Sequence, residues 1–178
     1  MALAAPAGRR AMRGCAGRPR RGEHPLDKLI IRPARTEDLP VLVDMYQDLS
    51  LEGESREEVG RPLPEAYGQA FRQIEADPRQ RLLVAEAGGR IVATLVLIIV
   101  PNLTHVGRPW AVIENVVVAH GERDRGCGEI LMRHAIEEAR RAGCYRLSLT
   151  CNKRRTDARR FYERLGFVAT HEGYRIMF

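Results

Sequence analysis

A strand that runs through a glycine-rich turn directly into a helix constrains the fold of this chain more than any other feature. Residues 112–139, VIENVVVAHGERDRGCGEILMRHAIEEA, follow this order. The apolar, β-branched segment is typical of a buried strand, and the last part has the periodicity of a helix. The first turn of such a helix exposes backbone N–H groups at the positive end of the helix dipole. We therefore predict an anion site here, with phosphate as its natural ligand.

Two familiar phosphate-binding loops do not fit the glycine loop, by which we mean residues 119–128. Its glycines have the spacing of a Walker loop, but Cys127-Gly128 stands where lysine and Ser/Thr are needed. A dinucleotide fingerprint needs a third glycine and an acidic residue after the next strand, and that strand ends LTCNK. The remaining pattern is Arg123, Gly126 and Gly128 in R-x-x-G-x-G. A turn that needs positive φ explains the same glycines without a ligand, so both interpretations stay open.

The flanking sequence alternates strand and helix patterns. Gly88-Gly89 is a hairpin signal between two apolar runs, and Gly143 and Gly166 end helical patterns. The expected strands are 29–34, two strands within 81–101, 110–118, 145–151, and a closing strand or hairpin at 167–178. The expected helices are 36–50, 65–77, about 129–142 and 156–166. This order predicts an α/β fold of the α+β kind, with a mixed sheet.

Charge separates the first residues from the rest of the chain. Residues 1–28 carry seven basic and two acidic residues, a surplus of five within a formal net charge of +6. Residues 1–27 show no periodicity, so we expect a basic, disordered tail before a single domain at 28–178. No aromatic residue lies between the arginines of this tail, so we do not expect nucleic acid as a partner.

Hydropathy and cysteine spacing limit the environments in which we expect this protein to work. The apolar run 91–100 is too short for a membrane span of roughly 18 residues. Four cysteines show no CxxC spacing, and the five histidines give no zinc pattern beside them. We therefore expect a soluble, cytoplasmic protein that uses no metal.

Three motifs together resemble the GNAT superfamily of N-acyltransferases. VVVAHGERDRGCGEILM resembles its acetyl-CoA loop, IIRPARTEDLP its opening strand and helix, and TDARRFYERLGF its closing segment. The resemblance covers residues 29–178 and implies a mixed, mostly antiparallel central sheet flanked by helices, with splayed central strands. It also implies that residues 28–178 form an N-acetyltransferase domain that uses acetyl-CoA as co-substrate.

The resemblance places the acetyl-CoA contacts on the last strand residues before the glycine loop, on that loop and after the following strand. Three residues depart from the family pattern. Asp124 replaces a frequent second glycine, His120 a frequent proline, and Arg155 an asparagine often found seven residues before Tyr162. The residues expected to bind the cofactor are Val116, Val117, Val118, Arg123, Asp124, Arg125, Gly126, Cys127, Gly128 and Asn152.

Glu114 is the candidate general base. A protonated amine of pKa about 10.4 costs about 4–5 kcal/mol to deprotonate at pH 7, so a base is useful for acetyl transfer. Glu114 lies in an apolar strand two residues before Val116, and strand alternation predicts that both face the same side. IENVVV and GCYRLSLTC also resemble glucosamine-6-phosphate N-acetyltransferases, in which a glutamate occupies this position. A purely structural carboxylate is the alternative.

Tyr162 matches the family tyrosine that can donate a proton to the leaving thiolate. Packing of its ring in a helix is the simpler alternative. Cys127 stands at a helix N-terminus, where thiol pKa values fall, so a covalent acetyl-cysteine route is a further alternative. The acceptor is expected to contact Arg108, Trp110 and Tyr67.

The predicted function is acetyl transfer from acetyl-CoA to a primary amine by direct attack in a ternary complex. The acceptor is a small-molecule amine, an amino sugar among them, or a protein amino group. A noncatalytic acyl-CoA-binding regulatory protein is the alternative on the same fold. A homodimer through the terminal strand is also expected.

Overall fold

The computed structural model of the protein describes residues 29–50 and 60–178. The strands in this part of the chain are β1 (Ile30–Pro33), β2 (Gln80–Ala87), β3 (Arg90–Val100), β4 (Trp110–Val118) and β5 (Leu147–Leu149). The α-helices are α1 (Leu39–Tyr46), α2 (Glu65–Ala76), α3 (Thr104–Gly107), α4 (Cys127–Arg141) and α5 (Thr156–Arg164). Three short 3-10 turns are η2 (Thr36–Asp38), η3 (Gln47–Leu49) and η4 (His120–Glu122). The predicted basic tail, 1–27, lies outside the described residues.

The five strands form one sheet in the order β1-β2-β3-β4-β5. The pairs β1–β2, β2–β3 and β3–β4 are antiparallel, and β4–β5 is parallel. The Gly88-Gly89 turn joins Ala87 to Arg90 as the hairpin signal predicted, with both glycines at positive φ. The mixed, mostly antiparallel sheet expected from the sequence is confirmed.

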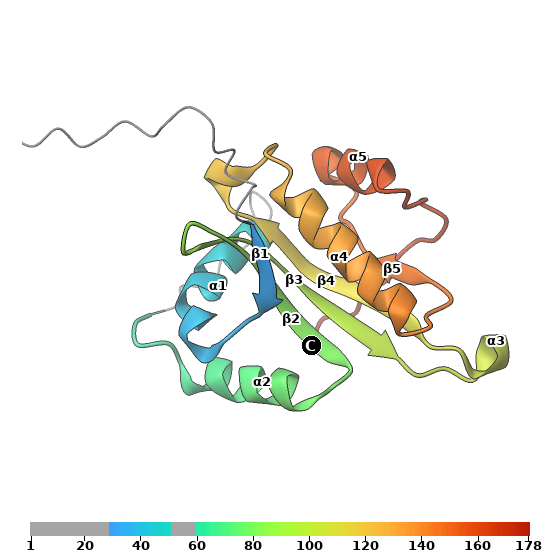
Figure 1. Cartoon of the computed structure of the whole chain (residues 1–178), viewed down its shortest axis with the longest axis horizontal. Coiled ribbons are helices and arrows are strands. Elements are labelled where there is room, and N and C mark those ends of the chain that lie inside the picture. The colour runs from blue at the N-terminus through green and yellow to red at the C-terminus, as the bar shows by residue number, and fades with distance from the viewer. Residues whose placement is uncertain (1–28, 51–59) are drawn as a thin grey trace, which may run out of the picture.

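Helices cover both faces of the sheet. Figure 1 shows α4 lying across one face, with α5 next to it and α1 and α2 beside the N-terminal strands. Under α4 the core contains Leu131 and Met132 of the helix against Leu95 and Ile113 of the sheet. On the other face a second core gathers around α1 and α2; its members are Ala34, Leu42, Phe71, Leu82, Val84 and Val96.

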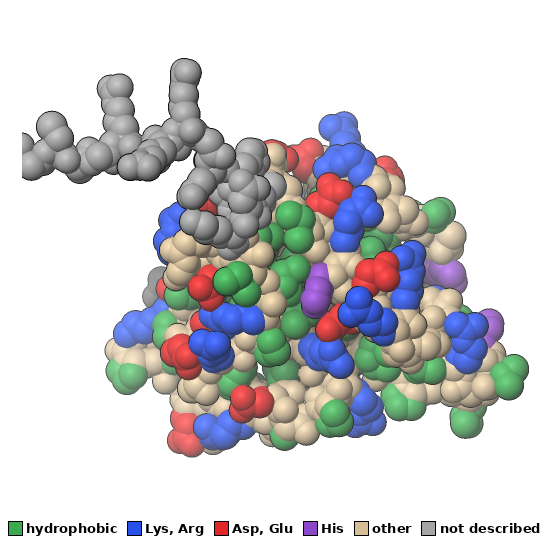
Figure 2. Space-filling view, in the orientation of Figure 1, with side chains coloured by type: hydrophobic (Ala, Val, Ile, Leu, Met, Phe, Trp, Pro, Cys, Tyr) green, Lys and Arg blue, Asp and Glu red, His purple; other side chains and the backbone are tan. Residues whose placement is uncertain are grey.

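Helix α4 has one apolar face and one charged face. Leu131, Ala135 and Ala139 recur at helical spacing and are buried against the sheet. The solvent face carries ion pairs one turn apart, such as Arg133–Glu129 at 2.8 Å. Figure 2 accordingly shows acidic and basic side chains interspersed over this side of the molecule. No helix of the described residues is both long and apolar enough to cross a membrane.

A bulge at Asn115 reverses the alternation of side chains along β4. Asn115 has φ 54, and the β3–β4 register shifts between Thr94 and Val96. Glu114 pairs with Val96 and so faces the core of α1 and α2, whereas Val116 packs against the core under α4. The prediction that Glu114 and Val116 share one face is therefore wrong, because the bulge inserts one residue between them.

The C-terminal segment also departs from the prediction. Residues 167–178 form no strand or hairpin, although their sequence is rich in strand-forming residues. β5 is three residues long, shorter than the predicted 145–151, and so offers little backbone for a further strand to pair with. The segment instead runs past the end of β5, where Lys153 pairs with Glu172 at 2.8 Å. The homodimer expected through this segment stays a prediction.

Candidate functional site

The parallel strands β4 and β5 separate in the middle of the sheet. They pair from Ala111–Leu147 to Ile113–Leu149, where β5 ends, while β4 continues to Val118. Among the described residues, no strand pairs with the β5 side of β4 beyond Ile113. The expected splay of the central strands is thus present, and it begins directly before Glu114.

The glycine loop crosses the end of this opening and leads into α4. Gly126 precedes α4 with φ 84, a left-handed conformation that glycine adopts at little cost. The amide of Ile130 bonds the carbonyl of Gly126, so the amides of Cys127, Gly128 and Glu129 precede the first bond of the helix. These amides lie at the positive end of the helix dipole, which suits an anion.

Gly128 allows α4 to approach β4. A Cβ at this position would lie 2.8 Å from Cγ2 of Val118 and 3.7 Å from the ring of Phe161. Two different requirements therefore explain the two glycines of the R-x-x-G-x-G pattern. Gly126 supplies a backbone angle, and Gly128 leaves room for a strand and a second helix.

The cations of the glycine loop have partners within the protein. Arg123 donates to the carbonyl of Val118 at 3.3 Å and to the carboxylate of Asp48 at 2.9 Å. Arg125 pairs with Glu122 at 3.0 Å. Asp124, which stands where a glycine is frequent, adopts φ 59. The loop therefore keeps the glycine-like backbone at this position despite the substitution.

Cys127 is buried, with 2% of its surface exposed, and its thiol donates to the carbonyl of Glu122 at 3.2 Å. Burial raises the pKa of this thiol above its ordinary value, although the amide of Gly128 acts in the opposite direction. The expectation that the helix N-terminus would lower the pKa of Cys127 is therefore wrong, because burial of the thiol outweighs the nearby amides and the charge of Arg125.

Glu114 lies half-buried where β4 and β5 separate. Burial raises the pKa of its carboxyl, and the positive charge of Arg175 partly opposes this. Within the part of the chain that the structure describes, no hydrogen bond or ion pair involves the Glu114 side chain. A carboxylate that is partly desolvated and not held by a partner can accept a proton from an amine.

Tyr162 lies on α5, next to the rings of Phe161 and Phe167 at centroid distances of 5.4 and 6.0 Å. Burial raises the pKa of the phenol to about 12; the ionised forms of Cys151 and Glu114 would act in the same direction, and the charge of Arg155 opposes them. At neutral pH the phenol is therefore protonated. The charge of Glu114 also acts on this pKa, so the two groups interact electrostatically, although Glu114 faces the core of α1 and α2 and Tyr162 packs against the core under α4.

Asn152 and Arg108, two further residues predicted for the site, both make hydrogen bonds within the protein. Asn152 accepts the Arg154 amide at 2.9 Å through its side chain, which orders the turn before α5. Arg108 donates to the carbonyls of Gly143 and Cys144 at 3.4 and 3.5 Å, beyond the end of α4.

Trp110 and Tyr67 belong to other parts of the fold. Trp110 pairs with Val100 at the end of β4 remote from the glycine loop, beneath the Arg146 guanidinium at 4.5 Å. Tyr67 is half-buried on α2, one turn before Phe71. The acceptor contacts of Arg108, Trp110 and Tyr67 stay predictions.

Sequence reasoning missed two arginines near the centre. Arg175 belongs to the segment predicted as a strand, and no local pattern connects it with Glu114. Arg155 was visible only as a departure from the family asparagine. No group of three or more His, Cys, Asp or Glu side chains in residues 29–50 and 60–178 could hold a metal ion.

Comparison with known proteins agrees with this geometry. Residues 42–167 match the Acetyltransferase (GNAT) family. The chain belongs to this family. The resemblance inferred from the three sequence motifs is thereby confirmed.

Individual members of the GNAT family are similar over parts of the chain. Glucosamine 6-phosphate N-acetyltransferase of Trypanosoma brucei brucei is 40% identical over 84 residues, 47% of this chain and 54% of the relative. Glucosamine 6-phosphate N-acetyltransferase 1 of Oryza sativa subsp. japonica is 38% identical over 108 residues, 58% of this chain and 63% of the relative. The matches thus span less than two thirds of either relative.

One solved structure is similar over almost its whole length. It is described as a transcriptional regulator from Bacillus halodurans C-125 and is 41% identical, with a TM-score of 0.77. The match covers 84% of this chain and 99% of that chain. The fold described above is therefore shared along nearly the whole of the described residues.

Proposed function

We propose that the protein transfers an acetyl group from acetyl-CoA to a primary amine by direct attack in a ternary complex. The observation that carries this proposal is the placement of Glu114. It is a partly desolvated carboxylate without a partner among the described side chains, at the point where β4 and β5 separate, and its charge reaches the protonated phenol of Tyr162.

The glycine loop supports acetyl-CoA as the co-substrate. The amides at the start of α4 suit the diphosphate, and the absence of a Cβ at Gly128 keeps the helix close to the strand. Because β5 has ended, the backbone of Val116 and the amide of Val118 can bond the pantetheine arm, whereas the Val118 carbonyl already accepts from Arg123. Bound acetyl-CoA supplies the activated acetyl thioester.

The residues have complementary tasks in this proposal. Glu114 takes a proton from the ammonium, directly or through water, because only the neutral amine attacks. The C–N bond forms and the C–S bond breaks, and Tyr162 gives its phenolic proton to the departing sulfur, which leaves as a thiol. The nitrogen is positively charged after the attack and gives up its second proton, which restores the Tyr162 phenol directly or through water. Glu114 releases the proton that it took from the ammonium to solvent. No covalent enzyme intermediate is needed, in keeping with the buried thiol of Cys127.

The acceptor is proposed to be a small amine, and an amino-sugar phosphate is the first compound to test. The two GNAT relatives described above are named for glucosamine 6-phosphate, and one of them is 40% identical over the matched residues. A protein amino group is the alternative acceptor. A cytoplasmic location agrees with these small substrates and stays part of the proposal.

The proposal is tested by measuring thiol release from acetyl-CoA with glucosamine 6-phosphate and a panel of other primary amines. Acetyl-CoA binding is followed in parallel by calorimetry. Glu114→Gln and Tyr162→Phe should each lower kcat by about 10²–10⁴-fold while leaving acetyl-CoA binding close to wild type. Binding without any transfer, or variants as active as the wild type, would contradict these roles.

A noncatalytic acyl-CoA-binding regulator is the second candidate. It is favoured by the matched solved structure, which is described as a transcriptional regulator. The same experiment separates the two functions. A regulator binds acetyl-CoA but releases no thiol with any amine, and Glu114→Gln then changes nothing measurable.

A further inference from the structure

Arg155 precedes α5 and reaches away from it to the turn η3. Its Nη2 donates to the carbonyl of Asp48 at 2.9 Å and also to the carbonyl of Leu49. The side chain is half-buried, and the main chain of Arg155 begins the helix by accepting the Arg159 amide at 3.1 Å. The start of α5 is thus attached to residues more than one hundred positions earlier.

Asp48 extends this connection to the glycine loop. Its carboxylate pairs with Arg123 at 2.9 Å, and Arg123 also donates to Val118 at the end of β4. One short turn therefore holds both the arginine of the glycine loop and the arginine that begins the Tyr162 helix. We call Asp48, Leu49, Arg123 and Arg155 the arginine clasp.

Tyr162 lies on the helix whose start this clasp holds. Arg155 stands directly before the first turn of α5, with a non-helical ψ of 73, and Tyr162 follows in the second turn. The charge of Arg155 reaches the phenol and lowers its pKa against the larger effect of burial. Phe161, the neighbour of Tyr162, meets the start of α4 at Gly128, so α5 and the glycine loop are also in direct contact.

We propose that Arg155 is a positioning residue, which acts through the arginine clasp to fix the Tyr162 phenol relative to the glycine loop. The inference rests on the proposed acid role of Tyr162. A guanidinium suits this task because it stays charged and is a rigid, planar donor. A lysine keeps the charge but places it on a flexible stem with different geometry. An uncharged amide such as glutamine lacks both the charge and the guanidinium fork.

The kinetic test is a double-mutant cycle between positions 155 and 162. Arg155→Gln should lower kcat about tenfold, with a smaller change in KM for acetyl-CoA, and Arg155→Lys should recover part of the loss. In the Tyr162→Phe background, Arg155→Gln should have little further effect, because its action requires the phenol. An equal loss in both backgrounds would overturn the positioning role.

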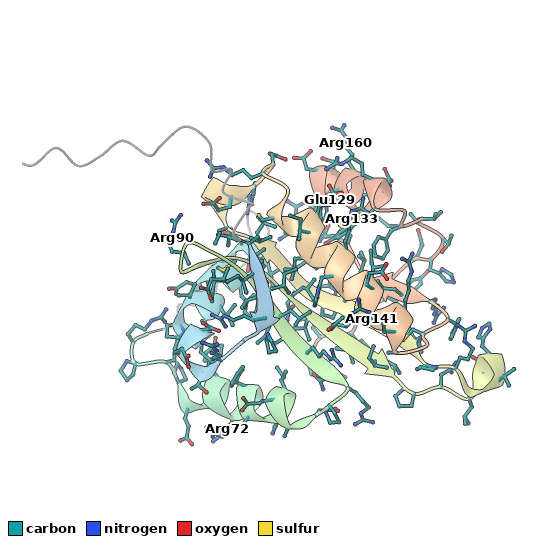
Figure 3. The ribbon with its side chains drawn as sticks, viewed as in Figure 1. Arg72, Arg90, Glu129, Arg133, Arg141 and Arg160 are labelled. Carbon is teal, nitrogen blue, oxygen red and sulfur yellow. The ribbon has the colours of Figure 1, made fainter. Side chains whose placement is uncertain are left out.

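Arg160→Gln is the matched control on the same helix. Arg160 points outward from α5 (Figure 3) and is exposed, so this variant should keep wild-type kcat and KM. If Arg155→Gln is no different from Arg160→Gln, the inference is wrong.

Hydrogen exchange of the α5 amides tests the clasp without turnover. Exchange should be faster in Arg155→Gln than in wild type and unchanged in Arg160→Gln, because only the first variant loses the bonds to Asp48 and Leu49. Equal exchange in all three proteins would refute the clasp. A wild type that acetylates no amine would instead refute the proposed function, and with it the role of Tyr162, whereas exchange would still decide whether the clasp exists.

Discussion

Gly128 in the first turn of α4 lies directly against Val118 at the end of β4, where a Cβ would come within 2.8 Å of the valine Cγ2. Val118 is β-branched and has little rotamer freedom to move aside. We expect Gly128→Ala to lower the free energy of unfolding by about 1–3 kcal/mol and to weaken acetyl-CoA binding. Urea denaturation and calorimetry measure the two effects.

Gly121→Ala is the control for this change. Gly121 lies in the same loop, has no positive φ and has open space where a Cβ would stand. Its substitution should alter the unfolding free energy by less than about 0.5 kcal/mol. Equal stability of the two variants would mean that α4 and β4 can separate at no cost.

The raised pKa of Glu114 predicts the acidic limb of the pH profile. The base works only when ionised, so kcat/KM should fall as the pH drops through a value above 4.5, the ordinary pKa of glutamate. Arg175→Gln removes a cation that favours the ionised form, so the limb should move to higher pH, whereas Arg175→Lys should leave it nearer its original place. If the acidic limb does not move in Arg175→Gln, or is still present in Glu114→Gln, the titrating group is a residue other than Glu114.

The same residue predicts an opposite effect on stability. A carboxyl whose pKa is raised by folding stabilises the protein below its unfolded pKa, and this contribution is lost as the pH rises through the folded value. At pH 7 Glu114→Gln should therefore unfold at the same temperature as the wild type or a higher one, while losing activity. A lower melting temperature would indicate that Glu114 is structural, and thermal denaturation at pH 7 decides between these outcomes.

Cys127 should react slowly with thiol reagents. Burial raises the pKa of this thiol, so the thiolate fraction at pH 8 is below that of an exposed cysteine. Iodoacetamide followed by mass spectrometry should modify Cys127 much faster in the unfolded than in the folded protein. Cys127→Ala should retain acetyl transfer, and a complete loss of kcat with intact acetyl-CoA binding would instead favour the acetyl-cysteine route.

A partly buried ion-pair cluster should anchor β1. Arg32 pairs with Asp38 at 2.6 Å and with Glu86 at 2.8 Å, and Asp38 accepts the Arg35 amide at 2.8 Å. These bonds lower the pKa of Asp38, mainly through Arg32, against the opposing effect of burial. Asp38→Asn should lower the free energy of unfolding by about 2 kcal/mol.

The pH dependence of this loss follows from the sign of the shift. A carboxyl with a lowered pKa stabilises the fold above its unfolded pKa, near 4, and loses this contribution as the pH falls through the folded value. Denaturation curves of wild type and Asp38→Asn should therefore differ most above about pH 5 and converge below pH 4. Glu37→Gln, at an exposed neighbour, should show no comparable loss.

Local features of the sequence accounted for most of the elements. The hairpin at Gly88-Gly89 and the junction from β4 into α4 depend on residues that are close in the chain, so backbone propensity and periodicity were sufficient to predict them. Helix α4 begins at Cys127, two residues before the predicted start, because Gly126 turns the chain at once. The three family motifs then predicted the fold class and the family.

Contacts between residues far apart in the sequence determined the side-chain orientation along β4 and the pKa values of the candidate residues, which the local pattern could not predict. The bulge at Asn115 depends on how β3 and β4 align, and it turned Glu114 away from the face of Val116. Burial in the folded protein raises the pKa values of Glu114, Cys127 and Tyr162. The sequence alone does not show how deeply each of these side chains is buried. An asparagine in an apolar strand was the one local sign of the bulge, since asparagine tolerates positive φ.

The sequence by itself thus determined the strand, the glycine loop and the helix, because steric limits and hydrogen bonding act between near neighbours. Only the tertiary structure decided which groups meet around the opening between β4 and β5. The Asp48 carboxylate on Arg123, the Arg155 fork on η3 and the Arg175 charge beside Glu114 each join segments far apart in the chain. Such contacts form when the sheet and helices pack together, and their electrostatic effects depend on the solvent that this packing excludes.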